Sequence, residues 1–342
     1  MELAGEARDE SFAALEAERA AASAVERVAP GLATARGIRP DRVRTLAYTR
    51  RISELVGRTD ADVASAVAVL EAASFDRSGT VAVRARNVRA TTEVSTAEAE
   101  RELGGVLVDR GFDVDLDDPD HVLRVCFAGD VCLVGWAVAE REAGFGSRTP
   151  TDRPFFQPGS MAPMDARAYV NLAAGHALPD ATVVDPMCGT GGLLIEVGLV
   201  GARAVGADAQ SKMAAGAAEN LAHYLDDADN GADADAISAS DANPDWDVVR
   251  GDATDLPFDD DAADGVVFDA PYGRQSKIAG HELEDLVAGA LAEAARIAPS
   301  CVLVADRSWT DAAEAAGWAV ADRFERRVHR SLVRHVHVLE RS

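Results

Sequence analysis

In the second half of the chain, short apolar runs alternate with longer segments of helical periodicity. Runs of small and β-branched residues predict strands at 182–185, 203–207, 247–250, 264–268 and 301–305. The segments between them predict helices at about 163–177, 211–225, 281–298 and 310–316. Two further strands, about 322–329 and 332–340, are close enough to form a hairpin. The order predicts an α/β fold with a parallel sheet and an antiparallel edge hairpin.

The first half has a different pattern of apolar positions. An Ala- and Glu-rich stretch predicts one helix over roughly 9–27, ended by Pro30-Gly31. Ser95-Thr96-Ala97-Glu98 is a capping box that starts a helix ending at Gly104-Gly105 or at Gly111. With a helix at 61–72, the other expected elements are strands at 79–86, 121–127 and 131–139. Residues 61–139 thus predict a compact α+β module.

These patterns divide the chain into four parts. Residues 1–60 form an N-terminal helical or ferredoxin-like segment with a basic stretch, and 61–140 form the α+β domain. Residues 141–162 are a Gly- and Pro-rich linker before the α/β domain at 163–342, which contains an Asp-rich, aperiodic insertion at 226–246. Because the linker phrase from Arg153 to Met161 contains two phenylalanines, we expect it to pack on the domain that follows.

Acidic side chains follow four strands of the predicted α/β domain. Asp185 ends the first strand, and Asp208, Asp252 and Asp269 end or follow the next three. The carboxyl ends of parallel strands meet at one edge, where open α/β sheets bind ligands. A loop with glycines at 189, 191 and 192 follows Asp185. Asp208 comes 23 residues after Asp185, a spacing that suits an acid bound to ribose hydroxyls.

The loop and the acids together favour a cationic ligand. The loop has no Lys-Ser/Thr pair, so it is not a triphosphate-binding P-loop. An acidic crevice fits S-adenosylmethionine, which carries a sulfonium, an ammonium and a ribose. An NAD-dependent enzyme is the alternative, although the loop has G-x-G-G rather than G-x-G-x-x-G spacing. A glycine-rich turn without any ligand is the plainest interpretation of the loop alone.

Charge adds an environmental feature. The net charge is -24 with a pI near 4.6, and only Lys212 and Lys277 of the 34 basic residues are lysines. An acidic surface nearly free of lysine is typical of proteins from a salt-rich cytoplasm, where charges are screened over about 3 Å at molar salt. A protein that avoids nucleic acid is the alternative from charge alone. The four scattered cysteines predict neither a metal site nor disulfides, and no stretch predicts a signal peptide or membrane helix, so we expect a cytoplasmic protein.

Local basic segments stand out against this acidity. Residues 36–51 contain six arginines and one aspartate, a net charge of +5. Arginines alternate with apolar residues in the strand at 79–86, which predicts arginines on one face. Such a face is either merely solvated or contacts phosphates, which the arginine fork suits. The candidate RNA-binding residues are Arg36, Arg39, Arg42, Arg44, Arg50, Arg51, Arg84, Arg86 and Arg89.

Three motifs carry a resemblance to a known family. The run DPMCGTGG with the later DAPYG resembles class I Rossmann-like amino-methyltransferases. The upstream α+β module is similar to a THUMP domain, an RNA-binding module. The phrase PFFQPGSM resembles the segment before the methyltransferase domain of archaeal tRNA (guanine-N2)-dimethyltransferases, which act on guanosine 10. The resemblance covers nearly the whole chain apart from 226–246.

The resemblance implies roles for individual residues. S-adenosylmethionine is the implied cofactor, tRNA the partner, and no metal or membrane is involved. The implied catalytic tetrapeptide is Asp269, Ala270, Pro271 and Tyr272, which departs from the family's Asp-Pro-Pro-Tyr pattern at Ala270. The implied cofactor-binding residues are Gln157, Asp185, Cys188, Gly189, Gly191, Asp208, Asp252 and Ala253.

The tetrapeptide has a chemical logic for an exocyclic amine. The lone pair of the guanine amine is delocalised into the ring, so the amine is a poor nucleophile. Hydrogen bonds from its N–H groups to the Asp269 carboxylate and the Ala270 carbonyl would localise that pair, while Tyr272 stacks on a base withdrawn from the RNA. The amine of adenine needs the same carboxylate and carbonyl acceptors. An amino-methyltransferase that acts at another tRNA site, on rRNA or on adenine is therefore an alternative. An RNA-binding protein with a degenerate methyltransferase fold is the alternative from another class, and the residues leave open whether one or two methyl groups are added.

Overall fold

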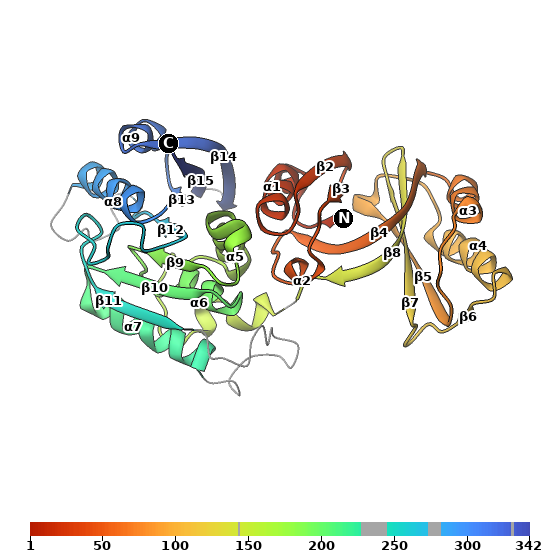
Figure 1. Cartoon of the computed structure of the whole chain (residues 1–342), viewed down its shortest axis with the longest axis horizontal. Coiled ribbons are helices and arrows are strands. Elements are labelled where there is room, and N and C mark those ends of the chain that lie inside the picture. Colours follow the sequence, from red (N-terminus) through yellow and green to blue (C-terminus); the bar gives the residue numbers. More distant parts are fainter. Residues whose placement is uncertain (143, 227–244, 273–281, 330–331) are drawn as a thin grey trace. The chain divides into compact units, whose positions relative to one another are not determined.

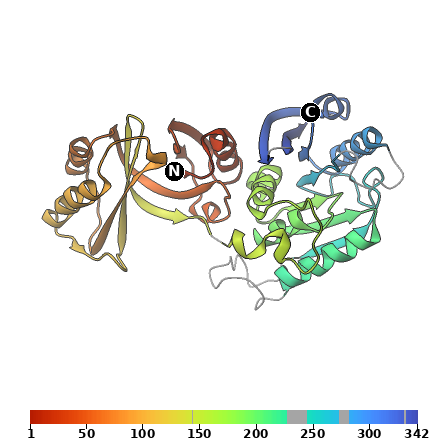
Figure 2. The same cartoon turned by 180° about the vertical axis from the view of Figure 1, so that it is seen from behind.

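The computed structural model divides into two compact units, Met1–Arg141 and Glu142–Ser342, each with its own sheet and core (Figures 1 and 2). It describes residues 1–142, 144–226, 245–272, 282–329 and 332–342. Most of the expected 226–246 insertion lies outside these residues. Within the described ranges, no helix is long and apolar enough to cross a membrane.

The first unit is built on one eight-stranded sheet. Its helices are α1 (Glu10–Ala20), α2 (Pro40–Val43), α3 (Val63–Ala72) and α4 (Thr96–Asp109). Its strands are β1 (Glu2–Leu3), β2 (Ala24–Ala29), β3 (Leu32–Arg36), β4 (Thr49–Asp60), β5 (Thr80–Asn87), β6 (Asp113–Val114), β7 (His121–Ala128) and β8 (Val131–Glu140). The strand order is β2-β3-β1-β4-β8-β7-β5-β6.

The long strands β4 and β8 join the two expected N-terminal parts into this sheet. They pair antiparallel from Arg51 opposite Glu140 to Asp60 opposite Val131. The boundary expected at residue 60 is therefore the end of β4, in the middle of a continuous sheet. Helices α3 and α4 pack side by side at the end of the unit formed by residues 61–140, whereas α1 and α2 lie at the other end (Figure 1).

The helix expected over 9–27 is wrong in its second half. Helix α1 stops at Ala20, and β2 and β3 form an antiparallel hairpin in which Ala24 lies opposite Arg36. Pro30-Gly31, which we interpreted as a helix stop, is the turn of this hairpin, and Gly31 has a φ of +74°. A Pro-Gly pair terminates a helix and connects two strands equally well, so the local sequence does not separate the two structures. The predicted helix start is confirmed, because Ser95 is the N-cap and its side chain accepts a hydrogen bond from the Glu98 N–H, and α4 runs on past Gly104 and Gly105.

The second unit has the predicted alternation of strands and helices. Its helices are α5 (Pro163–Ala174), α6 (Gly192–Leu199), α7 (Ser211–Leu221), α8 (Leu283–Ile297) and α9 (Thr310–Ala315). Its strands are β9 (Thr182–Asp185), β10 (Arg203–Asp208), β11 (Trp246–Arg250), β12 (Gly265–Asp269), β13 (Ser300–Ala305), β14 (Trp318–His329) and β15 (Leu332–Arg341). The α/β class with an antiparallel edge hairpin is confirmed.

The strand order of this sheet is β11-β10-β9-β12-β13-β15-β14. Strands β9 to β13 run parallel to their neighbours, and β15 and β14 are antiparallel. After β9 the chain goes first to β10 on one side and later to β12 on the other. The carboxyl end of β9 is therefore the topological switch point, where an open α/β sheet leaves a crevice.

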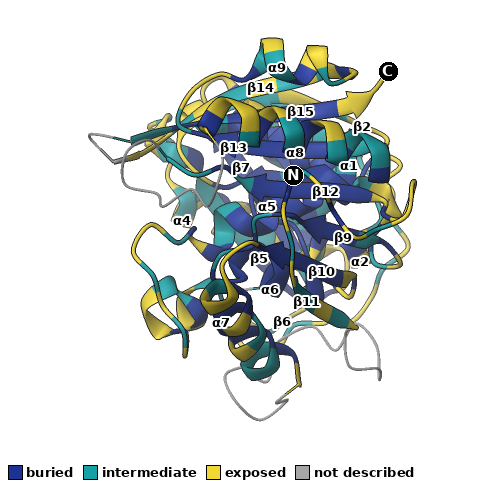
Figure 3. Cartoon of the chain, turned by 90° about the vertical axis from the view of Figure 1, so that its left-hand side faces the viewer, coloured by how far each residue is buried: buried dark blue, intermediate teal, exposed yellow. Residues whose placement is uncertain are grey.

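Helices cover both faces of the second sheet. Alternate residues of β12 and β13, including Val266, Phe268 and Leu303, join a buried cluster with α8 and α9. Helices α5, α6 and α7 contact one another and the strands β9 to β13. In Figure 3 the strands are mostly buried, while exposed positions gather on the outer sides of the helices. Strands buried on both faces explain why their sequences are nearly continuous apolar runs.

The linker packs on the second unit, as predicted. Asn220 on α7 is fully buried and accepts a hydrogen bond from the Phe155 N–H at 2.8 Å. Its amide also donates to the carbonyls of Phe155 and Thr190, at 2.8 and 2.9 Å. A β-carbon at Gly216 would lie 2.0 Å from the Phe155 ring, so α7 has a glycine where the ring packs. One amide side chain thus ties the linker to the glycine loop.

A buried ion triad fixes the start of the same linker. The Glu196 carboxylate on α6 is fully buried and accepts from Arg148 Nε at 2.6 Å and Nη2 at 3.1 Å. Arg167 Nη2 on α5 lies 2.8 Å from the same carboxylate. A single anion therefore balances two buried guanidinium groups from different segments.

We expect Glu196→Gln to lower the free energy of unfolding by about 3–5 kcal/mol, because it removes the carboxylate that two buried guanidinium groups share. Urea denaturation of the full chain measures the change. Glu219→Gln, on the exposed side of α7, is the matched control and should change stability by less than about 0.5 kcal/mol. Equal effects of the two variants would show that the triad is not a stabilising element.

Candidate active site

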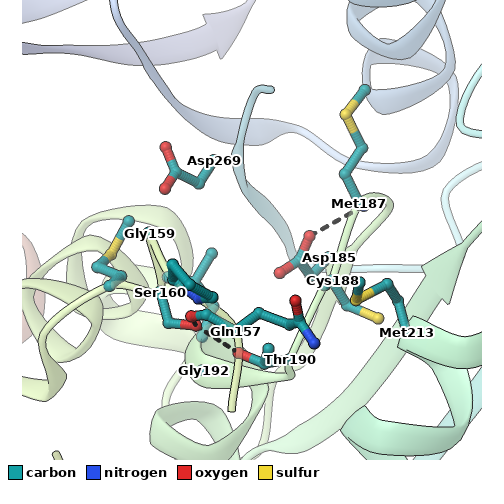
Figure 4. A pocket seen from close by; sticks show the side chains of 14 residues that line it. Gln157, Gly159, Ser160, Asp185, Met187, Cys188, Thr190, Gly192, Met213 and Asp269 are labelled. Carbon is teal, nitrogen blue, oxygen red and sulfur yellow. Dashed lines mark hydrogen bonds between the residues drawn. The ribbon is translucent and has the colours of Figure 1, made fainter. Parts of the chain in front are cut away.

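A pocket opens at the switch point of the second sheet (Figure 4). Asp185 and Asp269, from the ends of β9 and β12, face the same space. The lining comprises Gln157, Pro158, Gly159, Ser160, Met161, Asp185, Met187, Cys188, Gly189, Thr190, Gly192, Leu193, Met213 and Asp269. Five of the residues expected to bind the cofactor or the substrate, Gln157, Asp185, Cys188, Gly189 and Asp269, are thereby brought together.

Two glycines of the loop have different tasks. Gly189 has a φ of +52°, and a β-carbon there would find no atom closer than 4.0 Å, so it faces open space in the pocket. Gly191 has a φ of +75°, but its β-carbon would lie 2.7 Å from Leu221 Cδ1. Gly191 lies outside the pocket lining. Its lack of a side chain therefore serves the close packing of the loop on α7 rather than direct contact with a ligand.

The acids near the loop differ in their surroundings. Asp185 is 2% exposed, and burial raises its pKa well above the usual range, although the Met187 N–H donates to it at 3.0 Å. Burial also raises the pKa of Asp208. The N–H groups of Gln210 and Gly189 donate to its carboxylate at 2.8 and 3.1 Å and lower that pKa. A bound cation would favour the charged form of both acids.

The third expected acid lies apart from the pocket. Asp252 is exposed, and its carboxylate accepts from the Thr254 N–H and hydroxyl at 2.9 and 2.8 Å. Ala253 is buried in the cluster under α8. Neither residue lines the described pocket, nor does Asp208, whose contact with the loop is through Gly189.

The tetrapeptide expected to be catalytic, Asp269–Tyr272, is held by several contacts at the end of β12. The Ala270 N–H donates to the Val304 carbonyl of β13 at 2.8 Å, which fixes the backbone beyond Asp269. The Tyr272 hydroxyl donates to Asp269 Oδ1 and accepts from Arg334 Nε at 3.1 Å. Arg334 Nη2 lies 3.7 Å from Asp269 Oδ2. Gly273 of the DAPYG motif lies outside the described residues.

The pKa of Asp269 lies above the usual range for an aspartate. Burial raises its pKa to about 6, and the nearby Asp165 and Asp306 act in the same direction. The Arg334 guanidinium and the Tyr272 hydroxyl lower that pKa. A carboxyl group in this range is ionised at neutral pH and can still take up a proton.

The candidate RNA-binding arginines fall into two groups. Arg36, Arg44 and Arg50 are exposed. The others are buried or bound within the first unit: Arg42 is 4% exposed, Arg39 donates to the Ala20 carbonyl, Arg84 to the Leu116 carbonyl, and Arg51, Arg86 and Arg89 pair with Glu140, Glu2 and Glu10. Arg86 of β5, expected on an outward face, therefore holds the N-terminal segment, as does Arg89 just after the strand.

Several residues of the site were not predicted from the sequence. Arg334 and Asp165 contact the catalytic tetrapeptide or its partner, and Ser160, Thr190 and Met213 line the pocket. Arg334 left a signal, since it shares its strand face with Val336 and Val338, where an arginine needs an anion. Nothing in the local sequence marks the others.

The residues of the pocket fit a ligand with the chemistry of S-adenosylmethionine. The buried Asp185 carboxyl can pair with an ammonium group, which would favour its charged form, and open space above Gly189 admits a ligand against the backbone. Met161, Met187 and Met213 supply apolar, polarisable walls. Among the described residues there is no group of three or more His, Cys, Asp or Glu arranged for a metal ion.

Two family models match this chain. Residues 150–335 match an RMKL-like methyltransferase domain, and residues 63–136 match a THUMP domain. The solved structure of TrmN from Thermus thermophilus covers 100% of this chain and 98% of its own, with 20% identity and a TM-score of 0.48.

Two curated relatives match this chain over most of its length and most of their own. The tRNA (guanine(10)-N2)-dimethyltransferase of Methanothermobacter thermautotrophicus is 34% identical over 86% of this chain and 83% of its own. The enzyme of the same name from Pyrococcus abyssi is 31% identical over 77% of this chain and 74% of its own. With a THUMP domain and a methyltransferase domain in one chain, this protein belongs to the tRNA (guanine(10)-N2)-dimethyltransferase family.

Proposed function

We propose that this protein transfers methyl groups from S-adenosylmethionine to the N2 amine of guanosine 10 in tRNA, giving N2-methyl- and N2,N2-dimethylguanosine. One observation carries the proposal: the glycine loop and Asp269 line the same pocket. The family of the chain supports the choice of substrate. The first experiment incubates the protein with unmodified tRNA and labelled S-adenosylmethionine in high salt and identifies the nucleosides formed by mass spectrometry.

In this proposal Asp269 is the catalytic residue. Its carboxylate accepts a hydrogen bond from the target amine, draws the nitrogen lone pair out of the ring and takes up the proton released. The Ala270 carbonyl accepts the second N–H of the amine. Positioning supplies most of the acceleration, because a near-attack arrangement removes the entropy cost of bringing the reactants together.

S-adenosylmethionine, when bound, supplies the methyl group on a sulfonium. Asp185 and the backbone at Gly189 hold the methionine side of the cofactor, with Gln157 and Cys188 in the wall. Asp208 acts through its contact with the loop and on the ribose hydroxyls. Asp252 and Ala253 would serve the adenine side, which reaches beyond the lining described above.

The setting of the reaction is also a proposal. The acidic surface and the scarcity of lysine fit a salt-rich cytoplasm, where screening weakens repulsion between carboxylates. The four cysteines are buried and free, as in proteins from reducing compartments. The exposed arginines at 36, 44 and 50 would hold tRNA phosphates by charge and shape rather than by base sequence.

Replacing the catalytic carboxylate tests the chemistry. We expect Asp269→Asn to lower the single-turnover rate of methyl transfer by at least about 100- to 1000-fold, because an amide cannot accept from the amine as a charged acceptor does. Binding of S-adenosylmethionine, measured by calorimetry, should stay within about threefold. Asp259→Asn, on the exposed surface, is the control. Full activity of Asp269→Asn would remove Asp269 from the mechanism, and methylated adenosine in place of guanosine would change the substrate.

The pH profile follows from the raised pKa of Asp269. The carboxylate must be ionised to accept from the amine, so the single-turnover rate should fall as the pH drops below about 6 and level off above it. Cofactor and tRNA binding are measured at each pH to separate binding from chemistry. A rate independent of pH between 5 and 8, with binding unchanged, would contradict this role.

The exposed arginines give a test of RNA binding. The triple variant Arg36→Gln, Arg44→Gln, Arg50→Gln should bind tRNA about 10-fold or more weakly, and the slope of log affinity against log salt should flatten by about one per lost phosphate contact. Arg101→Gln, on the exposed side of α4, is the control. An unchanged salt slope would place the phosphate contacts elsewhere.

A further inference from the structure

Arg334 is the one cation of the described site that contacts the catalytic tetrapeptide. It lies on β15 and is 3% exposed. Ala305, the last residue of β13, pairs with His335. Arg334 therefore stands just beyond the carboxyl end of β13, at the sheet edge where Asp269 ends β12.

The surroundings of Arg334 are electrostatically demanding. Arg326 on β14 lies directly opposite it in the register, and like charges in that relation repel. Asp165, in the first turn of α5, bridges the pair: its Oδ1 lies 3.1 Å from Arg326 Nη2 and its Oδ2 lies 3.7 Å from Arg334 Nη1. One carboxylate thus bridges the buried Arg334 and the partly buried Arg326.

The other half of the Arg334 guanidinium faces the active site. Its Nε donates to the Tyr272 hydroxyl at 3.1 Å, and its Nη2 lies 3.7 Å from Asp269 Oδ2. The Tyr272 hydroxyl in turn donates a hydrogen bond to Asp269 Oδ1. Arg334, Tyr272 and Asp269 therefore close a triangle of contacts.

We propose that Arg334 is a positioning residue for methyl transfer: with Tyr272 it orients the Asp269 carboxylate toward the pocket and keeps it ionised. This inference rests on the proposed function. Because the 3.7 Å contact is an ion pair rather than a hydrogen bond, Oδ2 keeps its capacity to accept from the target amine. Tyr272 is bound by its hydroxyl, so its ring is fixed before any base arrives.

The charges around Asp269 show why one cation matters. The negative charges of Asp165 and Asp306 raise the pKa of Asp269, and Asp269 in turn raises the pKa of Asp185. The positive charge of Arg334 lowers the pKa of Asp269. The acidic groups that face this site are Asp165 on α5, Asp185 at the end of β9 and Asp306 after β13. The other titratable or charged groups are Tyr169 on α5, Tyr272 after β12, Arg326 on β14 and Arg334 on β15. Removal of Arg334 leaves Asp269 among these acids without its nearest cation.

Arg334→Met tests the proposal, because it keeps the length of the side chain and removes its charge and donors. We expect the single-turnover rate at pH 7 to fall about 100-fold. The acidic limb of the pH profile should move to higher pH by about one unit or more, since loss of a cation at this distance favours the protonated carboxyl. S-adenosylmethionine binding by calorimetry and binding of a tRNA transcript should stay within about threefold.

Two more variants separate positioning from folding. Tyr272→Phe removes the bridging hydroxyl and little else, and should lower the rate about 10-fold with the cofactor affinity unchanged. Arg334→Lys restores the charge but not the fork, so the pH profile should return while the rate recovers only in part. Arg327→Met, exposed on the same hairpin, is the matched control and should behave like the unmodified chain.

The outcomes distinguish this inference from the proposed function. Methyl transfer by the unmodified chain, together with a normal rate and pH profile for Arg334→Met, overturns the role of Arg334 alone. A lower rate in Arg334→Met with an unmoved pH profile, and normal activity of Tyr272→Phe, also overturns it and leaves a structural arginine. No transfer to guanosine by the unmodified chain overturns the proposed function itself, and with it this inference.

Discussion

Burying carboxyl groups at the ends of parallel strands costs free energy, and the site depends on how that cost is distributed. The Met187 N–H donates to Asp185, and burial raises the pKa of this carboxyl well above its usual range. Asp269 has both Tyr272 and Arg334 and is held near a pKa of 6. Asp208, on the other side of Asp185 in the strand order, accepts hydrogen bonds from two backbone N–H groups, so the three acids have different surroundings. The difference comes from the partners that the fold provides.

The same constraint organises the first unit. Glu2, Glu10 and Glu16 are buried, and each is balanced by arginines or backbone N–H groups of distant segments. The Glu16 carboxylate, for example, accepts hydrogen bonds from the N–H groups of Ala47 and Tyr48 at 2.6 and 2.7 Å. Several arginines that stand out in the sequence are used in this way. A cluster of positive charge in an acidic protein is therefore divided between holding the N-terminal segment and facing solvent.

Sequence analysis predicted the parts of the fold that local periodicity determines. The alternation of strands and helices and the acids at strand ends follow from residues within a few positions of one another. The hairpin at 24–36 was missed because the Ala-rich stretch favours a helix until β4 and β1 offer a sheet edge. Arg334 and Asn220 were missed because each acts on residues more than 60 positions away, and no local pattern records such a partner.

The two segments that the strand pattern makes peripheral complete the catalytic geometry. The linker supplies Gln157 to Met161 to the pocket, and the buried Asn220 amide locks that segment to the glycine loop. From the other end of the unit, the edge hairpin supplies Arg334 to Asp269. The parallel strands alone carry acids that would bind many cationic ligands. The two flanking segments therefore hold the loop on one side and the Asp269 carboxylate on the other, which is the arrangement that the proposed reaction needs.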